Sequence, residues 1–277
     1  MAEKSYDIRY SLEGVNKMSI APVSAIVPCY RCADTIERAV TSVVSQTQRP
    51  YELILVDDAS GDDTLKMLQN LRDRFGTDWI NVIPLPQNGG PSLARNKGWE
   101  MATQPYIAFL DADDAWHPCK IEIQHNWMKN HPNVALTGHD CIWIKSDEFS
   151  YTDLPREWKA WHISPRHLLL SNKLPTRSVM LRRDIPLRFE LTKRYSEDYL
   201  LWLQIVLSGY DAWRLELPLA YLFKAPYGEG GLSSDLLKME RGELDTYHGL
   251  HKTNLINKWV YLFFSVISII KFLRRLF

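Results

Sequence analysis

The chain has 277 residues, of which 45% are hydrophobic and 24% charged, and these proportions are typical of a globular protein with a sizeable core. Its formal net charge is zero, which argues against a strongly electrostatic partner, and we expect no nucleic acid binding. Four cysteines in a chain of this length do not indicate a disulfide scaffold, and the polar N-terminus has no apolar segment typical of a signal peptide. We therefore expect a cytoplasmic location.

The first half of the sequence alternates apolar runs with helical patterns. Buried strands are predicted at Val23–Val27, Leu53–Val56, Val82–Ile83 and Tyr106–Leu110. Helices are predicted between them, from Asp34 as N-cap, over Asp62–Phe75, and from the Asn88–Pro91 turn to Met101. Strands that alternate with helices predict an α/β fold with a mostly parallel central sheet flanked by helices.

The second half has a weaker pattern and is rich in tryptophan. One helix is predicted from Asp198 to Leu207, and Gly209 ends it. We divide the chain into an N-terminal extension (1–22), a first half (23–150), a second half (151–245) and a C-terminal helical tail (246–277). The junction at residue 150 is as compatible with a linker inside one domain as with a true boundary.

Acidic side chains follow two of the predicted strands. Asp57 and Asp58 come directly after the second strand, and Asp111, Asp113 and Asp114 follow the fourth. Ligands of open parallel sheets bind at the carboxyl ends of the strands, and clustered carboxylates repel each other unless a cation offsets their charge. Mg²⁺ and Mn²⁺ prefer oxygen ligands and bridge to substrate phosphates, so the pattern predicts a metal-diphosphate site. Loop capping by aspartate is the alternative explanation.

Four stretches of the first half resemble the family 2 glycosyltransferases of the GT-A fold. They are VSAIVPCYRCADTIERAVTSVVSQT, YELILVDDASGDDT, NGGPSLARNKGWEMA and YIAFLDADDAW, in the family's order and spacing, and SEDYLLWLQI resembles its acceptor-side motif. The resemblance implies an enzyme that inverts the anomeric centre while it transfers a sugar from a nucleoside diphosphate sugar, usually a UDP-sugar. Bacterial cell-surface polysaccharide or lipid-linked glycan synthesis is the expected setting.

The resemblance also assigns the donor side of the site. Pro28 and Tyr30 would lie beside the nucleobase, and Asp58, with Asp57, would contact the base or ribose. Asp111 opens the acidic motif that binds the donor. The family often has asparagine after the tyrosine, where this chain has Arg31.

The metal and the base follow from the same resemblance. Asp113 would approach the ribose or the metal, and Asp114 would bind Mn²⁺ or Mg²⁺, which stabilises the negative charge that develops on the leaving diphosphate. Asp198 matches the catalytic base, which takes the proton of the attacking hydroxyl. Glu197 lies beside it and would bind the substrate. Asp198 as a simple helix cap remains an alternative.

Other polar residues have competing interpretations. Arg95 and Lys97 are expected either to approach the donor phosphates or to lie on a solvated helix face. Cys29 and Cys32 form a Cys-x-x-Cys that would fit a redox site, and a zinc site from all four cysteines is a further alternative. A catalytically silent nucleotide-sugar-binding module and a nucleotidyltransferase also remain possible functions. His139 is expected to lie in a turn or at the border of the acceptor site.

The tail contains the apolar run WVYLFFSVISII at Trp259–Ile270, flanked by lysine and arginine residues. A spanning helix needs about 20 apolar residues, so this run is short. We expect residues 256–277 to form an amphipathic or apolar helix at the inner face of the cytoplasmic membrane, with basic side chains on anionic headgroups. Packing against the protein's own core or a second copy is the alternative.

Overall fold

The computed structural model describes residues 5–9, 19–144, 150–224 and 235–276. Two stretches of the expected N-terminal extension form strands, Ser5–Arg9 and the first residues of a strand that begins at Ser19. Residues 1–4 and 10–18 lie outside the described part.

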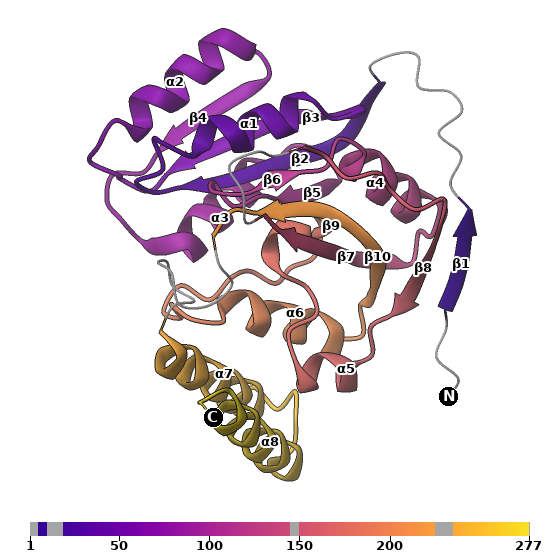
Figure 1. Cartoon of the computed structure of the whole chain (residues 1–277). Coiled ribbons are helices and arrows are strands. Elements are labelled where there is room, and N and C mark those ends of the chain that lie inside the picture. Colours follow the sequence, from indigo (N-terminus) through magenta and orange to yellow (C-terminus); the bar gives the residue numbers. More distant parts are fainter. Residues whose placement is uncertain (1–4, 10–18, 145–149, 225–234, 277) are drawn as a thin grey trace.

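The described residues form one ten-stranded mixed sheet (Figure 1). Its order is β1-β8-β10-β7-β9-β5-β2-β3-β4, and β6 pairs with β10. The strands are β1 (Ser5–Arg9), β2 (Ser19–Cys29), β3 (Gln48–Asp57), β4 (Ile80–Pro84), β5 (Tyr106–Phe109), β6 (Ala115–Trp116), β7 (Val134–Trp143), β8 (Glu157–His162), β9 (Met180–Arg182) and β10 (Asp211–Leu222). Strands β5, β2, β3 and β4 are parallel neighbours, as predicted, whereas β9 joins β5 to β7 by antiparallel pairing.

Helices cover both faces of the sheet. They are α1 (Ile36–Val44), α2 (Thr64–Phe75), α3 (Gly90–Met101), α4 (Lys120–Asn130), α5 (Pro165–Leu170), α6 (Glu197–Leu207), α7 (Leu236–Lys252) and α8 (Lys258–Leu276), with a short 3-10 helix, η1 (Thr176–Ser178). Helices α1, α2 and α4 pack into one core, and α3, α5 and α6 pack into the other. Helices α7 and α8 form an outer layer beyond α5 and α6 (Figure 1).

The two cores follow from the alternation of side chains along β2. Ala25 and Val27 belong to the core with α1, while Ile26 belongs to the core with α3. Helix α3 lies close to β2 because Gly98 has no side chain, and a Cβ there would come within 2.4 Å of Ile26. The α/β fold predicted from the sequence is therefore confirmed.

One local prediction is wrong. The cap of the first helix is Thr35 rather than Asp34, and no side-chain hydrogen bond caps the helix. The amide nitrogens of Thr35 and Ile36 instead donate to the carbonyl oxygen of Cys32, so a tight backbone turn takes the place of the expected aspartate cap.

Candidate active site

The predicted polar clusters meet at one edge of the sheet. Strand β2 lies between β5 and β3, and all three run parallel. The segments that follow their carboxyl ends therefore lie side by side, which brings together residues 28–30, 57–58 and 111–114. Tyr30 is 47% exposed at this edge, and the guanidinium of Arg31 lies 5.3 Å from its ring centre.

The Asp57–Asp58 turn, defined here as residues 57–61, is held by hydrogen bonds from neutral groups. The two carboxylate oxygens of Asp58 accept from the amides of Gly89 and Gly90, both at 2.8 Å, and from the side chain of Asn88. Asp57 accepts a hydrogen bond from the hydroxyl of Ser60. Burial raises the pKa of Asp58, and the two glycine amides offset part of that rise.

The Asp111–Asp114 turn, defined here as residues 111–114, is held by cations. Asp114 is buried, and its Oδ2 lies 2.9 Å from Nε of Arg177. Asp111 pairs with Arg95 at 3.0 Å and lies 3.5 Å from Arg177. Lys224 is 2.9 Å from the half-buried carboxylate of Asp113.

Electrostatics separate the two buried carboxylates of this turn. Burial raises the pKa of Asp114 well above its usual range, and the nearby carboxylates of Asp111 and Asp113 raise it further. The cation Arg177 opposes this rise but does not cancel it. Burial also acts on Asp111, but two guanidinium groups outweigh it and hold its pKa below the usual range. In this turn the arginines therefore stabilise the charged form of Asp111, whereas the charged form of Asp114 would be stabilised by a further cation.

A divalent cation fits this turn only if a bound substrate supplies further oxygen ligands. Within the described ranges, no three His, Cys, Asp or Glu side chains are grouped so that they could hold a metal ion by themselves. Asp113 and Asp114 nevertheless supply hard oxygen donors, and Mg²⁺ commonly binds through one or two carboxylates plus substrate phosphates. The turn thus fits a metal whose remaining ligands come from a diphosphate.

Glu197 and Asp198 lie at the start of α6, and Glu197 is linked to this turn. The buried guanidinium of Arg95 joins Glu197, at 2.9 Å, to Asp111. Burial raises the pKa of Glu197, a rise that Arg95 opposes and Asp198 reinforces. Arg95 therefore lies between carboxylates, and the solvated helix face considered for it is wrong.

Asp198 is half-buried and held from two sides. Its Oδ2 accepts hydrogen bonds from Thr176 Oγ1 at 3.0 Å and Asn172 Nδ2 at 3.2 Å, while Oδ1 accepts from the amide of Tyr199. The residue that caps α6 is Ser196, in the left-handed region at φ 56°. Asp198 thus lies in the first helical turn, with contacts to another element that a simple cap would not need.

The family model of glycosyl transferase family 2 matches residues 24–194, more than half of the chain. The chain belongs to glycosyl transferase family 2. It is therefore a glycosyltransferase, as predicted, and the oxidoreductase, nucleotidyltransferase and silent-module alternatives are set aside.

Two curated family members illustrate the range of relatives. WfaP of Escherichia coli, a UDP-Glc:α-D-GlcNAc-diphosphoundecaprenol β-1,3-glucosyltransferase, is 32% identical over 195 residues, which cover 69% of this chain and 72% of WfaP. TuaG of Bacillus subtilis, named for teichuronic acid biosynthesis, is 39% identical over 43% of this chain, and the match spans about half, 47%, of TuaG.

Solved structures share the fold. TarS of S. aureus in complex with UDP-GlcNAc has a TM-score of 0.64 at 19% identity, over 83% of this chain and 66% of TarS. The mannosyltransferase PcManGT of Pyrobaculum calidifontis, in complex with GDP-Man and Mn²⁺, has a TM-score of 0.64 at 16% identity, over 89% of this chain and 70% of PcManGT.

Further contacts at the site come from residues that no pattern in the sequence indicates. Arg177 and Thr176 of η1 contact Asp114 and Asp198 respectively, and Lys224, after β10, pairs with Asp113. No periodicity or motif marks them in the sequence, since each acts through a contact between distant elements. An arginine in an otherwise uncharged stretch, Leu174–Leu181, was the one available signal.

The remaining candidates are two buried thiols, a buried histidine and a lysine paired within its own helix. Cys29 and Cys32 are buried free thiols, and within the described residues no cysteine is disulfide-bonded or part of a metal-binding group. His139 lies in β7 and is fully buried, so its expected place in a turn is wrong. Lys97 pairs with Glu100 three residues on, on the surface of α3.

Proposed function

We propose that the protein transfers a sugar, with inversion, from a UDP-sugar to a hydroxyl group of a lipid-linked glycan in bacterial cell-surface polysaccharide synthesis. The observation that carries this proposal is that shared contacts connect the Asp111–Asp114 turn to Glu197 and Asp198. Arg95 ties the turn to Glu197, and η1 ties it to Asp198 itself. A group that accepts a proton therefore faces a group that binds a diphosphate.

The donor would lie along the carboxyl ends of β2, β3 and β5. Pro28 and the exposed ring of Tyr30 are suited to the nucleobase, and Asp57 and Asp58 to base and ribose. Because the oxygens of Asp58 already accept three hydrogen bonds, Asp58 would act with its present partners in place. The UDP-GlcNAc complex of TarS, a structure of the same fold, supports a UDP-sugar as donor. This donor half would span residues 23–150 and the acceptor half residues 151–245.

Asp113 and Asp114 would hold Mn²⁺ or Mg²⁺, which supplies charge stabilisation for the leaving diphosphate. Arg177 and Lys224 already bring positive charge to the same turn, at 2.9 Å from Asp114 and Asp113. The Mn²⁺ complex of PcManGT supports a metal in this fold. Removal of bound metal by a chelator is expected to leave the fold intact, because the arginines hold the turn without it.

Asp198 would be the catalytic base. Thr176 and Asn172 fix its Oδ2, which leaves lone pairs on a half-exposed carboxylate for the acceptor hydroxyl. Glu197 is bound to Arg95 and would position the base rather than take the proton. The acceptor in the name of WfaP, GlcNAc-diphosphoundecaprenol, supports a lipid-linked acceptor.

The test combines a donor screen with one variant. A panel of UDP-, GDP- and dTDP-sugars is incubated with Mn²⁺, and released nucleoside diphosphate is measured with and without acceptor. Asp198→Asn keeps the shape of the side chain but cannot take a proton, so turnover should fall by roughly 10²–10⁴-fold while UDP affinity stays unchanged. Wild-type protein that binds UDP but never releases it from any sugar donor would refute the proposed reaction.

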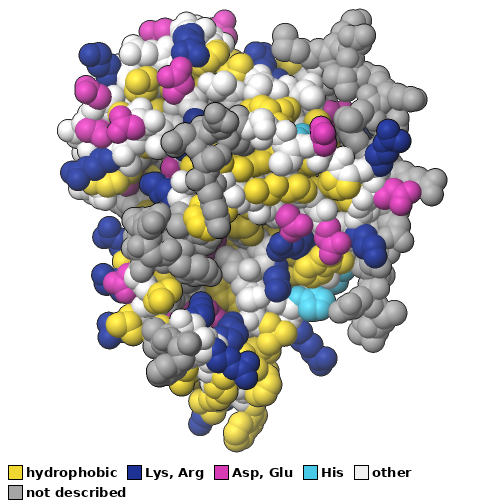
Figure 2. All heavy atoms as spheres, in the orientation of Figure 1, with side chains coloured by type: hydrophobic (Ala, Val, Ile, Leu, Met, Phe, Trp, Pro, Cys, Tyr) yellow, Lys and Arg dark blue, Asp and Glu magenta, His cyan; other side chains and the backbone are white. Residues whose placement is uncertain are grey.

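Helix α8 supports a peripheral membrane contact. One of its faces packs on α7, where the Ser268 hydroxyl donates to Glu240 and Lys271 pairs with Glu243. The opposite face is apolar and exposed, with Trp259 78%, Phe263 60% and Val266 55% exposed. Figure 2 shows hydrophobic side chains beside Lys and Arg at the end of the molecule where α8 lies.

We assign this face to the surface of an anionic membrane. Within the described residues no helix is long and apolar enough to cross a bilayer. An exposed apolar face with basic side chains on the same helix fits the interface of such a membrane.

The contact is tested by sedimentation with vesicles containing about 30% anionic phospholipid, a composition chosen to give basic side chains a surface potential to bind. Trp259→Gln with Phe263→Gln should reduce binding by at least tenfold, since both rings leave the apolar interface. Ile20→Gln, at an exposed apolar position on β2, is the matched control. The membrane assignment would be contradicted if the wild-type protein did not sediment with the vesicles at low salt, or if it self-associated through α8.

A further inference from the structure

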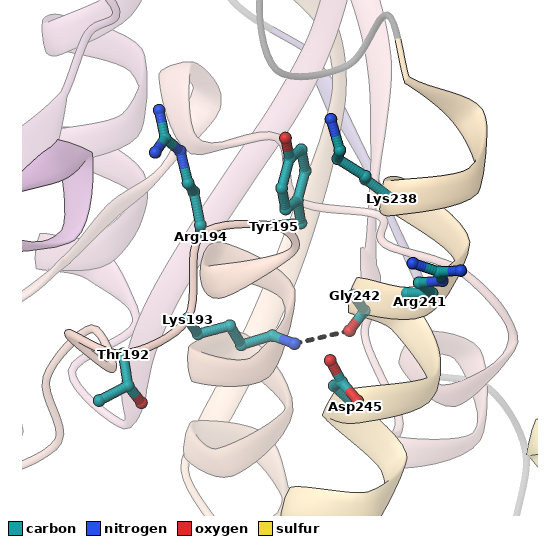
Figure 3. Close-up of a pocket in the computed structure, with 8 residues that line it drawn as sticks. All are labelled: Thr192, Lys193, Arg194, Tyr195, Lys238, Arg241, Gly242 and Asp245. Atoms are coloured by element: carbon teal, nitrogen blue, oxygen red, sulfur yellow. Dashed lines mark hydrogen bonds between the residues drawn. The ribbon is translucent and has the colours of Figure 1, made fainter.

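A basic pocket lies next to the start of α6, outside the residues assigned to donor, metal and base. It has a volume of about 180 Å³ and is formed by residues 192–195 and the first turns of α7 (Figure 3). Lys193, Arg194, Lys238 and Arg241 line it, against a single carboxylate, Asp245. Four cations around one small pocket create a local positive potential in a chain whose formal net charge is zero.

The pocket is built into the packing of the fold. Gly242 lets α7 approach the preceding loop, because a Cβ there would lie 2.7 Å from Cβ of Tyr195 and 2.8 Å from its carbonyl oxygen. The ammonium of Lys193 donates to the Gly242 carbonyl at 2.6 Å (Figure 3). The loop is therefore fixed against the helix, and the cationic side chains are presented by a rigid base.

Two of the cations are free to bind a ligand. In the ranges that the structure describes, no hydrogen bond or ion pair engages the guanidinium of Arg194 or of Arg241. Lys238 pairs with Asp235, one turn away at the N-cap of α7. A single guanidinium can bind a phosphate in a forked geometry through two parallel N–H donors, which makes an unpaired arginine suited to a phosphate ligand.

The position of the pocket relates it to the acceptor. Tyr195 precedes Asp198 by three residues, so their Cα atoms lie at most about 11 Å apart. Burial lowers the pKa of Lys193, and Asp245, Glu197 and Asp198 are the acids whose charges oppose that shift. The pocket thus lies close enough to Glu197 and Asp198 for their charges to act on Lys193.

We propose that this pocket binds the phosphate or diphosphate group that joins the acceptor sugar to its carrier, with Arg194, Lys238 and Arg241 as ligands. The proposal rests on the glycosyltransferase function proposed above. One end of the acceptor sugar would present its hydroxyl to Asp198, while the anomeric phosphate at the other end lies in the pocket. This arrangement selects phosphorylated acceptors over the same sugar without the phosphate.

The test is an equilibrium binding measurement that needs no turnover. Geranyl diphosphate is titrated into the protein by calorimetry in EDTA, which removes the metal that would hold a diphosphate at the Asp111–Asp114 turn. We expect the wild type to bind geranyl diphosphate but not geraniol. Arg241→Gln should weaken binding about tenfold, and Arg194→Gln with Arg241→Gln about a hundredfold, as expected for loss of one or two charge-assisted hydrogen bonds.

Lys252→Gln is the matched control, since Lys252 is an exposed cation on the same helix but outside the pocket. It should leave the affinity unchanged. Equal binding by the wild type and the double variant would overturn the proposal. So would a wild type that binds inorganic diphosphate but not geranyl diphosphate, because the site would then serve a free anion. Hydrolysis of UDP-sugars by the wild type is measured separately, and its failure would contradict the proposed function rather than the pocket.

Discussion

Two acidic turns lie at the same edge of the sheet, yet they are neutralised in different ways. In the Asp57–Asp58 turn, Asp58 accepts hydrogen bonds from two backbone amides and an asparagine. In the Asp111–Asp114 turn, the carboxylates pair with the side chains of Arg95, Arg177 and Lys224. Both turns have the same residue type, the same place in the fold and a buried aspartate.

This difference indicates that the partners of Asp58 are fixed by the fold, whereas the cations beside Asp113 and Asp114 can be exchanged for another cation. Backbone amides at the start of α3 cannot leave Asp58 unless the helix itself moves. Side-chain cations on η1 and after β10 can rotate away from Asp114 and Asp113, so another cation can take their place. The role of an aspartate motif at a strand end is therefore better inferred from the hydrogen-bond and ion-pair partners of its carboxylates than from its sequence alone.

The largest expected effect comes from Asp114→Asn. The amide keeps the size of the side chain but loses the charge, and the clamp on the leaving diphosphate is worth several kcal/mol. Sugar transfer should therefore fall by about 10³-fold or more. Stability should change by less than about 1 kcal/mol, because Asp111 remains beside Arg177 and a neutral amide is easier to bury than a carboxylate. Activity assays and urea unfolding measure the two quantities.

The same substitution at Asp58 should have the reverse profile. One amide oxygen cannot accept from Gly89, Gly90 and Asn88 together, and the amide NH₂ would face donors. Asp58→Asn should therefore lower the free energy of unfolding by about 1–3 kcal/mol, the cost of unsatisfied buried donors. Metal affinity, measured by Mn²⁺ titration with UDP, should stay unchanged. If Asp58→Asn unfolds like the wild type, or Asp114→Asn is the more destabilised of the two, the distinction between the turns fails.

Ser60→Ala should have the smallest effect. Ser60 donates to Asp57 and accepts from the amide of Arg31, which has a left-handed φ of 47°. Loss of these bonds should cost about 1 kcal/mol each at most, and it should loosen the segment that carries Tyr30. A raised KM for the UDP-sugar with an unchanged kcat would be the kinetic signature. Ser45→Ala, an exposed hydroxyl that bonds only to the Thr41 carbonyl, is the control.

Much of the first half of the chain could be predicted because its signals are local. The apolar runs around Ala25, Leu53 and Ile107 are continuous, and parallel topology alone brings their polar ends together. The predicted residues 57–58 and 111–114 therefore meet at one edge, although their roles in binding remain proposals.

The second half of the chain could not be predicted to the same depth. Arg177, Lys224 and Thr176 reach the site only because β9 inserts between β5 and β7 and because β10 returns beside β7. The pocket at Lys193 and Arg241 likewise depends on a glycine that lets two segments touch. Such contacts depend on long-range pairing, which leaves no period in the sequence.

The three residues of η1 have a consequence for the order of events in a catalytic cycle. Thr176 bonds to the proposed base, the neighbouring Arg177 pairs with the metal turn, and Ser178 is held in place through its backbone by Gln124. A cation that arrives at Asp114 competes directly with Arg177, and any backbone adjustment that follows is transmitted to the hydroxyl that orients Asp198. Under the proposed roles of Asp114 and Asp198, η1 would therefore couple the binding of the donor to the orientation of the base.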